Sequence, residues 1–78
     1  MSDSFKKLIE VAFDIKVFLG VESYTLYQYE DGSIVEFHVQ KIVNPRGLIN
    51  LICGRDIRFF HGESDITIRV YENLFDLT

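Results

Sequence analysis

The chain has 78 residues, of which 47% are hydrophobic and 14% aromatic. This length predicts one small domain over residues 1–78, which buries only about 60–65% of the surface that its unfolded form exposes. The hydrophobic content excludes intrinsic disorder. The single cysteine, Cys53, excludes an internal disulfide framework and a cysteine zinc cage. No apolar stretch approaches the roughly 20 residues that span a bilayer, so we predict a cytoplasmic protein with no membrane partner.

The net charge is −4, from 8 basic and 12 acidic residues. Residues 1–39 carry three basic and seven acidic residues, whereas residues 40–78 carry five of each. Binding of duplex DNA requires a broad basic surface, so a chain with this negative net charge is not expected to bind it. Four of the five later cations are arginines, which are suited to phosphate. A small RNA site therefore stays open.

A helix is predicted over about residues 4–18. The apolar side chains that recur at three- and four-residue spacing are Phe5, Leu8, Ile9, Ala12, Ile15 and Leu19. Ser2 to Ser4 offer capping oxygens before this pattern, and Gly20 ends it. Alternating apolar residues from Val11 to Val17 leave a second interpretation open, in which the helix stops near Asp14 and continues as extended chain.

The chain after Gly20 is predicted to consist of strands and turns. Glu30-Asp31-Gly32-Ser33 is a hairpin signal, and Asn44-Pro45-Arg46-Gly47 is interpreted as a turn because proline fixes φ and glycine closes it. Further breaks are expected at Gly54 and between His61 and Asp65. The five predicted strands cover about residues 22–30, 33–43, 48–53, 57–61 and 66–72.

One helix and five short strands predict a mainly β (α+β) fold, in which a strongly bent antiparallel sheet closes into a small barrel capped by the helix. The last two strands, 57–61 and 66–72, lack the proline and lysine that usually protect a sheet edge. Phe59 and Phe60 are adjacent, so their side chains point to opposite faces and one must leave the core. We therefore expect these two strands to pair head to tail between copies and to close a homo-oligomeric ring.

The order of elements and three short motifs resemble the Sm-like family (Sm, LSm and Hfq proteins). Tyr29-Glu30-Asp31-Gly32 is similar to the end of that family's first hairpin strand, and Leu48-Ile49-Asn50-Leu51-Ile52 resembles its first sequence motif. The stretch from Phe60 to Ile68 resembles its second motif. The resemblance covers most of residues 5–71 and implies an Sm-like or SH3-like five-stranded barrel.

The resemblance also implies a function, which is binding of single-stranded RNA, with uridine-rich RNA as one candidate, in loops around a central pore. These loops map onto residues 44–50 and 61–65 of this chain. Asparagine amides can bond base edges, histidine can stack on a base or meet phosphate, and arginine can contact phosphate. The predicted RNA-binding residues are Asn44, Arg46, Asn50, His61, Gly62 and Glu63.

Other conspicuous side chains are interpreted as structural. Cys53 alternates with apolar neighbours and is expected in the core. Glu36 and His38 share a strand face and could form an acid–base or metal pair, although such pairs also occur commonly on solvent-exposed strand faces without a chemical role. The four tyrosines could stack on bases, but strand packing and subunit contacts are the preferred interpretation; they are Tyr24, Tyr27, Tyr29 and Tyr71.

No phosphate loop, metalloprotease motif or nucleophile elbow occurs in the sequence. We therefore predict a non-catalytic protein with no cofactor and no metal site. The first functional hypothesis is the RNA-binding ring. The alternative is a small-barrel protein-interaction module with no nucleic-acid role, in which the acidic body and an apolar edge recognise a protein.

Overall fold

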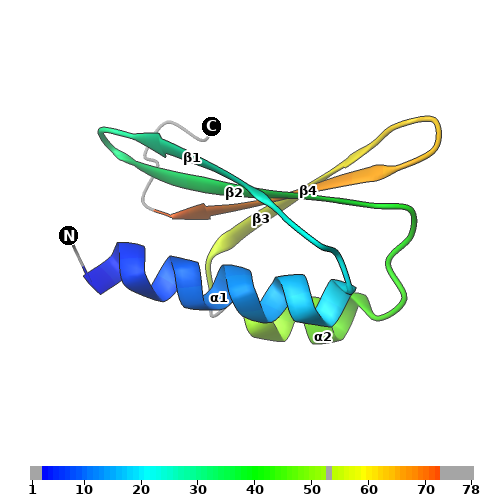
Figure 1. Cartoon of the computed structure of the whole chain (residues 1–78), viewed down its shortest axis with the longest axis horizontal. Helices are drawn as coiled ribbons and strands as arrows, with labels where there is room; N and C mark the ends of the chain where they lie inside the picture. The colour runs from blue at the N-terminus through cyan, green and yellow to red at the C-terminus, as the bar shows by residue number, and fades with distance from the viewer. Residues whose placement is uncertain (1–2, 53, 73–78) are drawn as a thin grey trace.

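The computed structural model describes residues 3–52 and 54–72, which form an α+β fold with an N-terminal helix and a four-stranded antiparallel sheet. The strand order is β1-β2-β4-β3, and every neighbouring pair is antiparallel. Both helices lie on one face of the sheet, below it in Figure 1. In the described part of the chain, the other face carries no helix.

Helix α1 spans Asp3–Leu19, which confirms the helix predicted over residues 4–18. Its apolar stripe is buried against the sheet, with Leu8 and Ile15 fully buried. The N–H groups of Gly20 and Val21 donate to the carbonyl of Lys16 (3.0 and 3.2 Å), and the glycine adopts φ 71°. This left-handed residue satisfies the last carbonyls and ends the helix. The alternative in which the helix stops near Asp14 is wrong.

Strands β1 (Thr25–Tyr29) and β2 (Gly32–Val39) form the hairpin that the Asp31-Gly32 signal predicts. Strands β3 (Asp56–His61) and β4 (Ile66–Glu72) form a second hairpin. β2 then pairs with β4, so the two hairpins join through their second strands. All four strands lie within ranges that the alternation of the sequence predicts, apart from one residue at the start of β2 and one at the start of β3.

The core lies between the helices and one face of the sheet. β2 and β4 each contribute alternate side chains to it, because successive residues of a strand point to opposite faces. The fully buried apolar residues are Leu8, Ile15, Val35, Phe37, Leu48, Ile68 and Val70. Tyr24 packs on Phe37 with ring centroids 5.4 Å apart and planes tilted by 44°. Phe59 packs against this core, whereas Phe60 is exposed. The expectation that one of these two phenylalanines leaves the core is confirmed.

The strand predicted over residues 48–53 is wrong, because helix α2 occupies Pro45–Leu51. Asn44 caps this helix by accepting a hydrogen bond from the N–H of Gly47 on its side chain (3.0 Å), and Pro45 begins the first turn. Leu48 then points into the core. Cys53, the last residue of the predicted strand, lies outside the described residues, and so does its predicted place in the core.

The five-stranded barrel is therefore not confirmed. Over residues 3–52 and 54–72 the sheet has four strands and is not closed. β4 lies between β2 and β3, so both of its backbone edges are already paired. The expectation that residues 66–72 form a free edge for ring assembly is wrong. Within the described chain the two edge strands are β1 and β3.

Candidate functional site

The face of the sheet opposite the helices, here called the outer face, gathers most of the chemically distinctive side chains. The strand registers align them in three rows that cross the sheet. The first row contains Tyr27, Ile34, Tyr71 and Asp56, the second Thr25, Glu36, Arg69 and Arg58, and the third His38, Thr67 and Phe60. Tyr29 extends the aromatic row at the β1–β2 turn. Rings thus flank a polar middle row.

The middle row is built around the buried carboxylate of Glu36, which is only 6% exposed. Arg69 Nε donates to Glu36 Oε2 at 2.6 Å, and His38 Nε2 lies 3.1 Å from Glu36 Oε1. The hydroxyl of Tyr27 donates to the same Oε1 at 3.4 Å. Thr67 Oγ1 lies 3.2 Å from His38 Nδ1. The carboxylate therefore ties three strands together and has partners for both oxygens, as a buried charge requires.

Burial raises the pKa of Glu36 and is the largest single influence on it. The hydrogen bonds and charges of Arg69 and, to a smaller extent, of His38 act in the opposite direction, and together they lower the pKa below its ordinary value of 4.5. The same contact with Glu36, together with Tyr71, raises the pKa of Arg69. The ionised pair is therefore the stable form at neutral pH.

A carboxyl group whose folded-state pKa is lowered contributes stability that is present above its unfolded-state pKa and is lost as the pH falls through the folded-state value. We expect the urea midpoint of the wild-type chain to fall between about pH 5 and pH 3. Glu36→Gln is expected to be less stable at pH 7 and to show a shallower fall over this interval. Parallel pH profiles of the two proteins would contradict the assignment.

The arginines of the outer face also contact its rings. The guanidinium of Arg58 lies 5.7 Å from the ring centroid of Tyr71, and that of Arg69 lies 5.0 Å from the centroid of Phe60. These are cation–π distances. Arg58 and Arg69 are balanced on the same face by the carboxylates of Glu36 and Asp56. The outer face is thus aromatic and polar at once, with formal charges that cancel.

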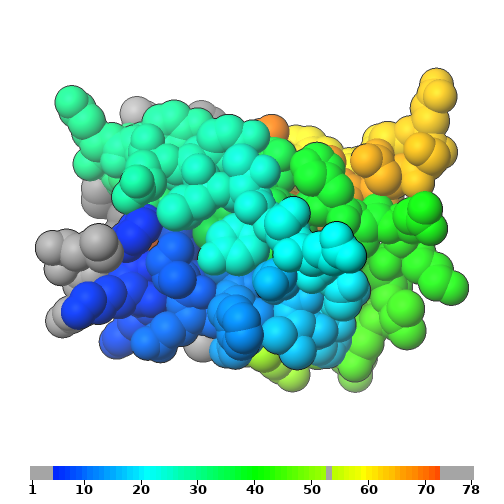
Figure 2. All heavy atoms as spheres, in the orientation of Figure 1, coloured from blue at the N-terminus to red at the C-terminus, as the bar shows by residue number. Residues whose placement is uncertain are grey.

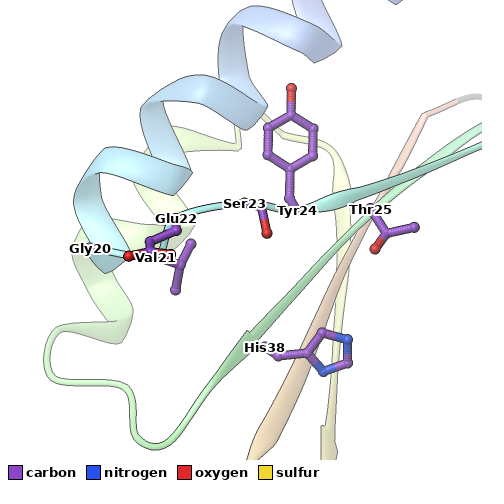
Figure 3. Close-up of a pocket in the computed structure, with 7 residues that line it drawn as sticks. All are labelled: Gly20, Val21, Glu22, Ser23, Tyr24, Thr25 and His38. Carbon is purple, nitrogen blue, oxygen red and sulfur yellow. The ribbon is translucent and has the colours of Figure 1, made fainter.

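A depression of about 410 Å³ lies beside the outer face, where the α1–β1 connection passes the end of β2 (Figure 3). It is lined by Gly20, Val21, Glu22, Ser23, Tyr24, Thr25 and His38. In Figure 3 the ring of Tyr24 points away from the imidazole of His38 and toward α1. Both ring nitrogens of His38 already have partners in Glu36 and Thr67. The depression is therefore lined by the hydroxyl groups of Ser23 and Thr25 and the carboxylate of Glu22, and both nitrogens of its imidazole are engaged.

Glu36 and His38, considered above as an acid–base or metal pair, are in contact in the structure, and His38 also contacts Thr67. These side chains do not form a metal cluster. In residues 3–52 and 54–72, no three histidine, cysteine or acidic side chains are grouped so that they could hold a metal ion. The network holds the outer face together by hydrogen bonds across β1, β2 and β4.

The predicted RNA-binding residues fall into two separate groups. Arg46 and Asn50 are exposed on α2 and Asn44 caps it, all within the helix layer. His61, Gly62 and Glu63 lie at the tip of the β3–β4 hairpin, where the N–H of Gly62 donates to the carbonyl of Asp65 (2.8 Å). This tip projects from the molecule on the side away from α2, as the yellow segment at the upper right of Figures 1 and 2. The structure does not bring the two groups into one site.

Sequence reasoning did not select Arg58, Arg69 or Phe60 as site residues. Their positions were nevertheless encoded in the alternation of the last two strands, since residues 58 and 60 share a face and so do 67, 69 and 71. The alternation does not predict that β4 pairs with β2. This pairing places Arg69 beside Glu36, which is 33 residues away in the sequence. Tyr27, Tyr29 and Tyr71 were considered as platforms, and all three lie on the outer face.

Comparisons with family models, with curated proteins and with solved structures find no match for this chain. Among the described residues, no helix combines the length and the apolar character needed to cross a membrane.

Proposed function

We propose that this chain is a non-catalytic protein-interaction module whose partner docks on the outer face of the sheet. The observation that carries the proposal is the combination of exposed rings and arginines on a face that no helix of the described chain covers. Tyr29 is 54% exposed, Phe60 44% and Tyr27 38%. Tyrosine, phenylalanine and arginine are enriched in protein interfaces, and tyrosine and arginine are also enriched in their energetic hot spots.

The rigidity of the outer face supports the same function. Its side chains stand on the strands of one sheet and are cross-linked by Glu36, His38 and Arg69. A partner therefore meets a face whose polar centre is already held in place, so these side chains lose little entropy on binding. The expected partner is a protein surface with an apolar centre that matches the exposed rings of Tyr27, Tyr29 and Phe60.

The charge of the outer face favours a protein over a nucleic acid. Affinity for RNA comes largely from cations that neutralise phosphates and release counterions. Here Arg69 is already paired with Glu36, Asp56 stands on the same face as Arg58, and the whole chain carries −4. A phosphate backbone crossing this face would meet two carboxylates as well as two guanidinium groups, whereas a protein partner needs no excess of positive charge.

Single-stranded RNA, the first hypothesis from the sequence, is the second candidate. The observation that favours it is the placement of arginines beside rings on an open four-stranded sheet, an arrangement on which unstacked bases can stack. In this proposal the RNA lies on the outer face and not in a pore lined by residues 44–50 and 61–65. The Sm-like resemblance and ring assembly belong to this second candidate, with β1 and β3 as the available edges.

The two candidates are separated by a photo-reactive phenylalanine analogue placed at Tyr29, with the same analogue at Phe13 as the matched control. Phe13 is 57% exposed on α1, so it reports contacts of the helix side. After irradiation in the cells that express the protein, we expect a cross-linked protein band from position 29 that survives nuclease. A nucleic-acid adduct at position 29, removed by nuclease, would establish the RNA candidate instead. Cross-links only at position 13 would refute both.

A further inference from the structure

We infer that the free edge of β3 is a self-association surface, through which two copies of the chain pair antiparallel about a two-fold axis at Phe59. This inference does not depend on the proposed function. It rests on which backbone groups β3 leaves unpaired, on the side chains beside them, and on the match that results when the strand meets its own copy.

The backbone groups of β3 that face away from β4 follow from the hairpin register. β3 and β4 pair without interruption from Asp56↔Tyr71 to His61↔Ile66. One step further, the N–H of Gly62 donates to the carbonyl of Asp65, which makes this a hydrogen-bonded pair. Bonded and non-bonded pairs alternate along an antiparallel ladder. The non-bonded residues of β3, whose N–H and C=O groups point outward, are therefore Ile57, Phe59 and His61.

The alternation of hydrogen-bonded and non-bonded pairs continues across the sheet. β4 forms its backbone hydrogen bonds to β2 at Ile68 and Val70, and β2 forms those to β1 at Ile34 and Glu36. Tyr29 and Gly32 become a bonded pair, as a two-residue hairpin turn requires. Strand β1 is the other edge and leaves outward backbone groups only at Leu26 and Gln28. Among residues 3–52 and 54–72, β3 therefore offers the longer row of backbone donors and acceptors that no strand pairs.

A two-fold axis at Phe59 uses the whole of that row. Ile57 then lies opposite His61 of the second copy, and Phe59 opposite Phe59, so every outward-facing group of β3 gains a partner. On the outer face Arg58 comes opposite Phe60 of the other copy, and the reverse contact follows by symmetry. Arginine over an aromatic ring is a favourable pair, so the strand is complementary to itself.

Other registers match less well. In a regular antiparallel ladder the axis must pass through a residue, because a bonded position cannot face a non-bonded one. An axis at Arg58 places two arginines directly opposite each other, which is destabilising. An axis at Ile57 pairs Asp56 with Arg58 but leaves His61 beyond the overlap. The register at Phe59 combines the longest overlap with no pair of like charges.

The resulting dimer is one continuous eight-stranded sheet. Its two helix layers lie on one side and its two outer faces on the other, since residues directly opposite each other in a ladder share a face. The middle row of each copy, which ends at Arg58, then continues into the row of the other copy that ends at Phe60. A partner that binds the outer face would thus meet the site twice, which raises its apparent affinity by avidity.

The register is tested by disulfide formation between two single-cysteine proteins, Arg58→Cys and Phe60→Cys, each in a Cys53→Ser background. Positions 58 and 60 would be a non-bonded pair about 4.5 Å apart between Cα atoms, within the range of a disulfide. Two copies of the same variant would place their cysteines roughly 8 Å apart, beyond that range. Both side chains are exposed, so the fold is expected to persist, as circular dichroism checks.

On mild oxidation we expect the mixture of the two variants to give at least about tenfold more disulfide-linked dimer than either variant alone. The unmodified chain should show reversible dimerisation by sedimentation in the micromolar range. A mixture that yields no more dimer than its components overturns the register and the inference. So does an unmodified chain that stays monomeric throughout that range. Neither result bears on the cross-link at position 29, so the proposed function is judged separately.

Discussion

Phe37→Ala is expected to lower the free energy of unfolding by about 3–5 kcal/mol. Phe37 is fully buried, and its ring is in contact with that of Tyr24. It lies on β2, which pairs with both β1 and β4. The substitution therefore leaves a cavity between the middle of the sheet and the helices. A domain of this length has roughly 4–12 kcal/mol of stability in total, so the loss removes a large part of it.

The matched control is Phe13→Ala, which removes the same side chain from an exposed position on α1. Phe13 is 57% exposed, and Lys16 Nζ lies 5.9 Å from the centroid of its ring. Its removal is expected to change stability by less than about 0.5 kcal/mol. Urea denaturation of the two variants and the wild-type protein measures both values. Equal losses for Phe37→Ala and Phe13→Ala would show that the helices do not cover this face of the sheet.

The sequence was sufficient to predict several elements of the fold. The three- and four-residue spacing in α1, the Asp31-Gly32 turn, and the alternation through β2 and β4 all match the structure. In each case the local preference and the burial of one face agree. The polarity of the strands also separated the core face from the outer face, including the split between Phe59 and Phe60.

Helix α2 was missed because its signals admit two interpretations. Asn44 followed by Pro45 is both a turn signal and a capped helix start, and the five residues from Leu48 to Ile52 are nearly all apolar. A short apolar run does not distinguish a strand from a buried helical turn. The helical pattern is visible afterwards, since Leu48 and Ile52 are four residues apart and both buried, whereas Ile49 is exposed.

The strand order could not be read from the sequence for a different reason. Placing β4 between β2 and β3 depends on pairing between segments that are far apart in the chain, and local periodicity carries no such information. Consequently the ion pair of Arg69 with Glu36 and the three rows of the outer face were not predicted. The same missing information led to the wrong expectation that residues 66–72 form a sheet edge.

Tyr27→Ala combined with Tyr29→Ala is expected to weaken partner binding by about 100-fold, or roughly 3 kcal/mol, because exposed rings of this kind act as hot spots. Both tyrosines lie on the outer face in β1, at the opposite end of the sheet from β3. Self-association through β3 should therefore be unaffected. Tyr27 donates to Glu36 at a long 3.4 Å, so a small loss of stability is expected as well.

The matched control is Phe13→Ala combined with Val17→Ala. It also removes two exposed apolar side chains, but from the outward side of α1. This variant is expected to bind the partner with the affinity of the wild-type protein. Thermal unfolding of both double variants shows that any loss of binding is not a loss of fold.

Docking on the outer face of the sheet is measured by titrating the purified partner, identified through the cross-link at position 29, against wild-type protein and the two double variants. The dissociation constant is expected to rise about 100-fold for the tyrosine variant and to stay constant for the helix variant. A constant value for the tyrosine variant, or a large rise for the helix variant, would contradict docking on this face.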